Sequence, residues 1–364
     1  MTRLAALLLL LSARAGAVEK DYGAVTSDGW RIALHRYEPA QTRFREPVLL
    51  SHGFIENRRI WDLDAEHSLA RRLSERGFDV WTMELRGSGE SQAGRRFSIE
   101  DFIRFDAPAS IEAVLKETGA PQVLMVGHSL GGLITYATLE GPLAPKVRAA
   151  VTLAGAGTMS GGPALQLAFN RFFKILGLTL GPVLPDNAPF APGWALHHAL
   201  GENDRAWAEL GKKLDSPLGQ PFWAEEDVTP KQVEALLRLS VTDTSMNVVR
   251  DFLRFAKQGK VDGVTDRLGL IKTPVLAIAG SEDQIIPPSD VRFVAEQAHA
   301  RYVEIEGAGH EDLCFGAAAA AHVNPLVVDW LASQATPVAS KLDRAKARVE
   351  SALLRLDRAL RALR

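Results

Sequence analysis

The stretch LMVGHSLGGL, residues 124–133, decides the fold. It joins a short apolar run, 122–127, to an amphipathic segment of helical length that ends at residue 140. The pentapeptide GHSLG at the junction matches G-x-S-x-G, a pattern in which a strained turn projects the serine into open space. Its two glycines leave room for so sharp a turn, which larger side chains would block. The sequence therefore predicts a strand, a sharp turn at Ser129 and a helix.

Similar apolar runs recur along the chain, and most of them lack clean polar alternation, as is typical of strands covered on both faces. They are PVLLSHG at 47–53, FDVWTMEL at 78–85, VRAAVTLAG at 147–155, TPVLAIAG at 273–280 and RYVEIEG at 301–307. Amphipathic segments such as 64–76 lie between the runs, and a closing helix is expected at about 317–333. Strands that alternate with helices predict an α/β fold with a mainly parallel central sheet flanked by helices. An N-terminal hairpin with its turn at 27–29 precedes this series.

Two regions depart from the alternation. Residues 157–267 are long, helical in pattern and rich in Phe, Trp and Leu, which predicts a helical cap or lid inserted between two core parts, 18–156 and 268–334. The tail, 335–364, reads as an amphipathic helix with apolar residues at heptad spacing and a basic excess. Such a helix can lie on an anionic membrane surface, pair with another helix or pack against the protein body.

The first 17 residues have one early Arg, a short apolar run and the small residues Ala15-Gly16-Ala17. This pattern predicts a cleavable signal peptide and a secreted or periplasmic protein. Cys314 is the only cysteine, so no intrachain disulfide can form, and a buried apolar thiol is expected. The net charge of −2 argues against a nucleic-acid partner, since phosphate-binding domains normally carry a strong basic excess.

A serine hydroxyl is a weak nucleophile unless a base takes its proton. After such a serine, the acid and the base are expected in the order Asp, then His. Asp283 follows the run at 273–279 and His310 follows the run at 301–306, so both are placed at the edge of the sheet that carries Ser129. His310 would take the proton, and Asp283 would hold the imidazole in the required tautomer. Glu282 is the alternative acid, but the G-x-x-D spacing from Gly280 favours Asp283.

Two backbone amides are the candidates for an oxyanion hole. The amide of Leu130 opens the helix after the serine, where the helix dipole favours negative charge. The second donor should come from a loop after an earlier strand, and Phe54, in the segment HGF at 52–54, is the candidate.

Together these features resemble the α/β-hydrolase superfamily, of the serine esterase or lipase type with a helical cap, over roughly residues 20–334. MELRGSGES at 83–91 is similar to the family's D-x-R-G-x-G-x-S loop, with Glu84 in place of the usual Asp. TSDGWRIALHRYEP resembles the N-terminal hairpin of secreted ester hydrolases and acid lipases. The resemblance implies the fold and the triad, but very little about the substrate. We expect hydrolysis of a small-molecule or lipid ester through an acyl-enzyme, and no sequence motif implies a cofactor.

Other functions remain to be weighed. A cofactor-free haloperoxidase or an acyltransferase would use the same triad for other chemistry. A binding protein on a hydrolase scaffold would need no nucleophile, so the intact triad speaks against it. Haloalkane dehalogenases and epoxide hydrolases of this family carry an Asp as the nucleophile. Because this chain has Ser129 at that position, the resemblance excludes both classes.

The substrate pocket is the least defined part of the site. His128 is expected as a pocket-wall residue, and among the aromatic residues of the 157–267 segment Phe172 and Trp223 are candidates for the acyl side. Most of those aromatics would form the core of the cap itself. The pair His197-His198 has no third ligand at useful spacing, so no metal site is predicted.

Overall fold

The computed structural model describes residues 18–94, 96–160, 189–214, 222–224, 227–338 and 349. Within them, a sheet of eight strands has the order β1-β2-β4-β3-β5-β6-β9-β10. The strands are β1 (Val18–Val25), β2 (Arg31–Glu38), β3 (Val48–Ser51), β4 (Val80–Met83), β5 (Val123–His128), β6 (Val147–Leu153), β9 (Val275–Gly280) and β10 (Arg301–Ile305). β2 runs antiparallel to both β1 and β4, and every other pair is parallel. The predicted hairpin and the mainly parallel sheet are therefore confirmed.

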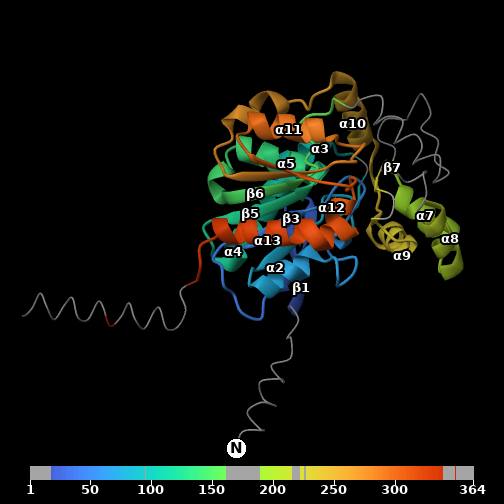
Figure 1. Ribbon diagram of the computed structural model, residues 1–364, viewed down its shortest axis with the longest axis horizontal. Coiled ribbons are helices and arrows are strands. Elements are labelled where there is room, and N and C mark those ends of the chain that lie inside the picture. Colours follow the sequence, from blue (N-terminus) through green and yellow to red (C-terminus); the bar gives the residue numbers. More distant parts are fainter. Residues whose placement is uncertain are drawn as a thin grey trace, which may run out of the picture.

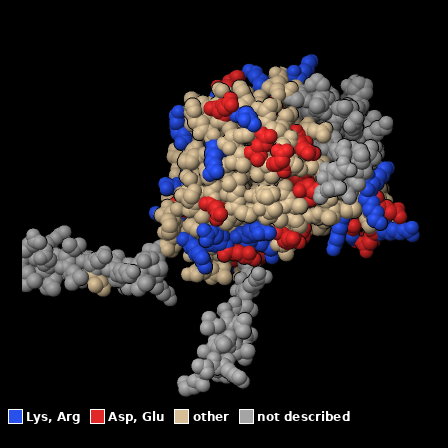
Figure 2. Space-filling model, in the orientation of Figure 1, with Lys and Arg blue, Asp and Glu red and all other residues tan. Residues whose placement is uncertain are grey.

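Helices cover both faces of the sheet, which explains why its central strands are continuous apolar runs. β3, β4, β5 and β9 are buried along their whole length. In Figure 1, α5 (Leu130–Glu140) and α11 (Pro288–Gln297) lie above the strands, and α2 (Leu69–Arg76) and α13 (Asn324–Gln334) lie below them. On the face drawn in Figure 2, acidic and basic side chains are interspersed among uncharged residues.

The helix predicted at 64–76 begins later, at Leu69. The Ser68 hydroxyl accepts a hydrogen bond from the Arg71 amide at 3.0 Å, which caps the helix there. The carboxylate of Asp64 instead accepts hydrogen bonds from the amides of Glu66 and His67 and holds that segment in a turn. Gly77, at φ 104°, ends the helix as predicted.

The remaining core helices connect the strands or follow the last one. They are η1 (Arg58–Trp61), α3 (Ile99–Asp101), η2 (Phe102–Asp106), α4 (Ala107–Thr118), η3 (Ala144–Lys146), η5 (Thr265–Leu270), α12 (Asp312–Phe315) and η6 (Ala319–Val323). The closing helix predicted at 317–333 passes through the π-helical stretch η6 into α13, and α13 contacts β6. Cys314 is buried in α12, as predicted.

Between β6 and β9, the described residues form a small second layer. It contains the two-stranded antiparallel ribbon of β7 (Pro189–Phe190) and β8 (Thr244–Ser245), together with α7 (Pro192–Leu200), α8 (Asp204–Leu214), α9 (Pro230–Ala235), η4 (Leu236–Ser240) and α10 (Met246–Gln258). In Figure 1, α7, α8 and α9 lie to one side of the sheet. The predicted signal peptide, residue Phe172 and nearly all of the predicted tail helix fall outside the described residues. Within the described part of the chain, no helix combines the length and the apolar character needed to span a bilayer.

Candidate active site

Ser129 occupies the turn between β5 and α5 with φ 50° and ψ −111°, a conformation that L-residues rarely adopt. Its amide donates to the Leu153 carbonyl at 2.9 Å, which ties the turn to β6. A Cβ added at Gly127 would lie 2.2 Å from the Gly131 carbonyl oxygen, and one added at Gly131 would lie 2.1 Å from the Ser51 carbonyl oxygen. Both glycines are therefore required by close backbone contacts, as the pentapeptide predicts. Strain of this kind costs about 1–3 kcal/mol and is concentrated at functional sites.

His310 and Asp283 meet at the same edge of the sheet, in loops that follow β10 and β9. His310 Nδ1 lies 2.8 Å from Asp283 Oδ2, and both side chains are buried. Asp283 Oδ1 accepts hydrogen bonds from the amides of Ile285 and Ile286, each at 2.8 Å. Glu282 is exposed. The structure thus pairs the histidine with Asp283 and not with Glu282.

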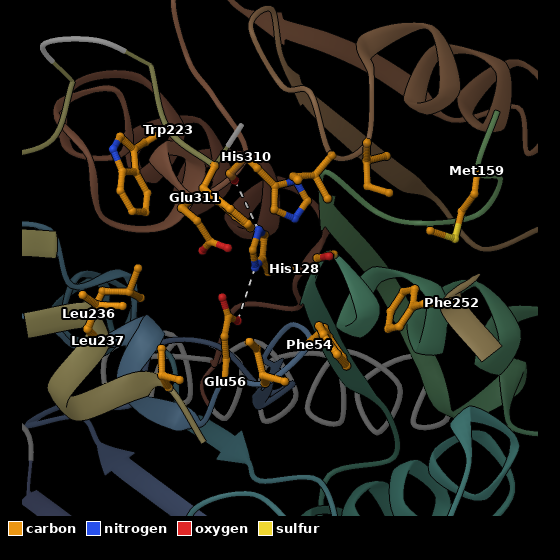
Figure 3. Close-up of a pocket in the computed structure, with 16 residues that line it drawn as sticks. Phe54, Glu56, His128, Met159, Trp223, Leu236, Leu237, Phe252, His310 and Glu311 are labelled. Atoms are coloured by element: carbon orange, nitrogen blue, oxygen red, sulfur yellow. Dashed lines mark hydrogen bonds and ion pairs between the residues drawn. The ribbon is translucent and has the colours of Figure 1, made fainter. Parts of the chain in front are cut away.

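Ser129 and His310 line one pocket (Figure 3). Because Asp283 engages Nδ1, the ring nitrogen of His310 that remains for proton transfer is Nε2. Leu130 is the first residue of α5, so its amide has no acceptor within that helix. Phe54, in the loop after β3, also lines the pocket. Ser129, His310 and Phe54 therefore line one pocket, whereas Asp283 contacts it through His310 and Leu130 directly follows Ser129.

The pocket wall is mostly apolar. His128 and Trp223, both predicted for the pocket, belong to it, whereas Phe172 cannot be placed. Further apolar lining residues were not predicted from the sequence, namely Ile55, Met159, Phe222, Leu236, Leu237, Val241, Phe252, Ile285 and Ile286. Six of the apolar residues on this wall, Trp223 included, lie between positions 222 and 252, in the segment predicted to form a cap.

Two buried carboxyl groups, Glu56 and Glu311, also line the pocket and were not predicted. Burial raises the pKa of Glu311 well above its usual range, and the adjacent Glu56 carboxylate raises it further. Burial opposes ionisation of Glu56 too, but the nearby His128 outweighs it and holds the pKa of Glu56 below its usual range. In the sequence, only their positions could have pointed to these two residues, because Glu311 directly follows His310 and Glu56 lies two residues after Phe54.

The loop after β10 that carries His310, here called the base loop, is fixed by Asp312 to the segment that carries Trp223. Asp312 Oδ2 accepts hydrogen bonds from the Gly309 amide at 2.6 Å and from the Ala224 amide at 2.7 Å. Burial raises the pKa of Asp312 to about 7. The loop that precedes His310 is therefore held directly against one wall of the pocket.

Potential metal ligands do occur in the described residues, although the sequence predicts no metal site. Ligand atoms of His128, His310 and Glu311 lie within 4.8 Å of one another, so these side chains are close enough to hold an ion. The pair His197-His198 lies elsewhere, on α7, where His198 stacks on Trp194.

Glu84, which replaces the usual Asp of the D-x-R-G-x-G-x-S loop, has a structural role. Its carboxylate accepts hydrogen bonds from the Glu90 amide at 2.6 Å and from the Arg58 amide at 3.4 Å. Glu84 is not among the residues that line the pocket. The Glu84 carboxylate therefore stabilises its own loop and does not face the pocket that Ser129 lines.

Comparison with known proteins agrees with this architecture. The Tear acid lipase-like protein of Mesocricetus auratus is 32% identical over 262 residues, which cover 67% of this chain and 65% of that protein. The Putative lysosomal acid lipase/cholesteryl ester hydrolase of Crotalus adamanteus is 33% identical, over 51% of this chain and 52% of that protein. The match thus covers between about half and two thirds of the length of these relatives.

Solved structures share the fold at low sequence identity. A putative lipase from Acinetobacter baumannii superposes with a TM-score of 0.59 at 17% identity, over 90% of this chain and 96% of that one. A putative aryl esterase from Burkholderia cenocepacia superposes with a TM-score of 0.56 at 15% identity, over 86% of this chain and 99% of that one. The family profile described as "alpha/beta hydrolase fold" matches residues 46–317, well over half of the sequence. The chain therefore belongs to the alpha/beta hydrolase fold family.

Proposed function

We propose that this protein hydrolyses carboxylic esters with Ser129 as the nucleophile, His310 as the general base and Asp283 as the residue that orients the base. The observation that carries the proposal is the Asp283–His310 pair, at 2.8 Å, beside a pocket that a strained serine also lines. This combination supports nucleophilic catalysis, because the hydrogen bond of Asp283 to Nδ1 leaves Nε2 of the neutral imidazole as a proton acceptor.

The reaction follows from these positions. Ser129 Oγ attacks the ester carbonyl carbon while His310 Nε2 takes the hydroxyl proton, and the carbonyl oxygen becomes an oxyanion. The amides of Leu130 and Phe54 stabilise that charge. His310 then gives the proton to the departing alkoxide, and an acyl-enzyme remains. Water, deprotonated by His310, attacks this acyl group; the bond to Ser129 Oγ breaks, His310 returns the proton to Oγ, and the acid is released.

The substrate class follows from the pocket wall. Its predominantly apolar lining favours an ester with an apolar acyl or alcohol group, such as a lipid ester. The lipase names of the relatives support the same choice. Because Phe222, Trp223, Leu236 and Leu237 belong to the 157–267 segment, we further propose that this segment is a cap that roofs the site.

Two proposals concern the chain ends. Export to a secreted or periplasmic location rests on the N-terminal pattern and accords with relatives named as tear and lysosomal acid lipases. Contact of the basic tail with a membrane surface or another helix rests on its sequence alone.

The test is ester hydrolysis by the purified protein. We expect turnover of p-nitrophenyl esters, with kcat/KM rising from acetate to octanoate, and loss of turnover in Ser129→Ala. In serine proteases, removal of a triad member leaves a residual rate about 10³–10⁴-fold above the uncatalysed one. A correctly folded Ser129→Ala variant with near wild-type turnover would show that another residue is the nucleophile.

A further inference from the structure

Three loops of the site meet at His128, the residue that precedes Ser129. Its Nδ1 lies 3.4 Å from Glu56 Oε2, in the loop after β3, and its Nε2 lies 3.2 Å from the backbone carbonyl oxygen of His310. Figure 3 shows the imidazole between these partners, with Glu56 on one side and the base loop on the other. The side chain of His128 therefore bridges the loop that carries Phe54 to the loop that carries His310.

The loop that carries Phe54 is strained and is closed by the same carboxylate. Ile55 has φ 54°, which is a rare conformation for a β-branched residue. Glu56 Oε2 accepts a hydrogen bond from the Gly53 amide at 2.6 Å, so the carboxylate spans the turn formed by Phe54 and Ile55. A Cβ at Gly53 would lie 2.8 Å from Glu56 Oε2 and 3.0 Å from His128 Nδ1. The orientation of the Phe54 amide thus depends on where Glu56 is held.

Oxygen atoms lie on both sides of the His128 ring, namely the Glu56 carboxylate and the His310 backbone carbonyl. Burial opposes ionisation of Glu56, but the nearby His128 outweighs it and holds the pKa of Glu56 below its usual range, whereas burial and the Glu56 carboxylate raise the pKa of Glu311. The other titratable groups near this pair are His52, Asp283, His310, Asp312 and Cys314.

We propose that Glu56 and His128 are positioning residues: they hold the Phe54 amide and the His310 loop in the geometry that Ser129 chemistry needs. The inference rests on the proposed ester hydrolysis and extends it to residues outside the triad and the oxyanion hole. Neither side chain exchanges a proton with substrate. Both act on the reaction through the loops that they join.

Kinetics of three variants test the proposal. Glu56→Leu removes the acceptor for the Gly53 amide, and His128→Phe removes the bridge. Loss of one oxyanion donor costs about 10²–10³-fold, so a displaced donor should lower kcat by about 10–100-fold while KM changes little. Glu56→Gln should retain kcat within about fivefold, because its amide oxygen can take the place of Oε2 and accept from both the Gly53 amide and Nδ1 of His128.

The control is Asp106→Asn, a buried carboxylate that pairs with Arg86 and does not line the pocket. It should lower the melting temperature with kcat unchanged, which separates lost stability from lost positioning. The double variant Glu56→Leu/His128→Phe should be no more than about threefold slower than the worse single variant, since both break one linkage. A folded Glu56→Leu protein with wild-type kcat would overturn the proposal, and so would a Gln variant as slow as the Leu variant.

Backbone amide NMR of Ser129→Ala provides a readout that needs no turnover. Glu56→Leu in this background should shift the amide resonances of Gly53 and Phe54, because the Gly53 amide loses its acceptor, whereas Asp106→Asn should leave them in place. Unmoved Gly53 and Phe54 resonances in Glu56→Leu would overturn the positioning proposal even if esters were hydrolysed. A wild-type protein that hydrolyses no ester, with these resonances shifted by Glu56→Leu, would instead overturn the proposed function.

Discussion

Replacement of Asp283 by Asn changes one atom at the centre of the site, and the surrounding contacts dictate how the new side chain must lie. The amides of Ile285 and Ile286 both donate to Oδ1, each at 2.8 Å. In the variant only the amide oxygen can accept these two hydrogen bonds, so the NH₂ group must take the position of Oδ2, 2.8 Å from His310 Nδ1. Nδ1 then has to accept a hydrogen bond, which places the ring proton on Nε2. His310 is held in the tautomer that cannot take a proton from Ser129.

The magnitude follows from this forced tautomer. In a serine protease, the same exchange lowers turnover by about 10⁴-fold, or about 5 kcal/mol in activation free energy. The two backbone hydrogen bonds leave no other orientation for the asparagine side chain, so we expect a loss of that order in kcat. The melting temperature should change little, because the shape and the hydrogen bonds to Ile285 and Ile286 are preserved.

The assay is steady-state hydrolysis of p-nitrophenyl butyrate between pH 5 and pH 9, with thermal unfolding of each variant. Glu282→Gln is the matched control, since Glu282 is the adjacent carboxylate and is exposed. It should keep kcat within about twofold. A loss of less than tenfold in Asp283→Asn, or a larger loss in Glu282→Gln, would refute the reasoning about the tautomer.

Three further predictions concern the pocket, the stability and the tail. Trp223→Ser should lower the octanoate-to-acetate ratio of kcat/KM, because each buried methylene contributes up to about 0.8 kcal/mol; an unchanged ratio would remove Trp223 from the acyl site. Burial raises the pKa of Glu140 to about 8, so the folded state favours the protonated form and the wild type loses stability as the pH rises from about 4.5 through 8. Glu140→Gln should therefore raise the free energy of unfolding by about 1–2 kcal/mol at pH 9 and hardly change it at pH 4, as measured by urea unfolding. Equal effects at the two pH values would contradict this prediction. Truncation after Val338 should leave the protein soluble and kcat/KM for a soluble ester within about twofold of the wild-type value. The shortened chain keeps the hydrogen bonds of Thr336 to Glu46 and of Val338 to Arg43. Insoluble protein would show that the tail is structural.

The features that could be predicted from the sequence are those with local causes. At the Ser129 turn the steric cause is partly local, because a side chain at Gly127 would collide with the Gly131 carbonyl, whereas one at Gly131 would collide with the backbone of Ser51. Asp283 and His310 could be found because parallel strands end at one edge of the sheet, so position along the chain translates into position in space.

The features that were missed depend on tertiary contacts. Glu56 and Glu311 lie in loops far apart in the sequence, and only folding brings their carboxyl groups together beside His128. The positive φ of Ile55 runs against the preference of a β-branched residue, so no local rule predicts it. The later start of α2 results from competition between two nearby caps, Asp64 and Ser68, which the hydrophobic pattern does not resolve.

The central claim is that Ser129 is the nucleophile, and covalent labelling tests it most directly. The wild-type protein and Ser129→Ala are treated with a fluorophosphonate, which reacts with activated serines, and the digested proteins are analysed by mass spectrometry. We predict one adduct in the wild type, on the serine of the GHSLG peptide, and no adduct in the variant. An ester-hydrolysing protein whose label lies on another residue, or that is labelled equally in Ser129→Ala, would contradict the claim.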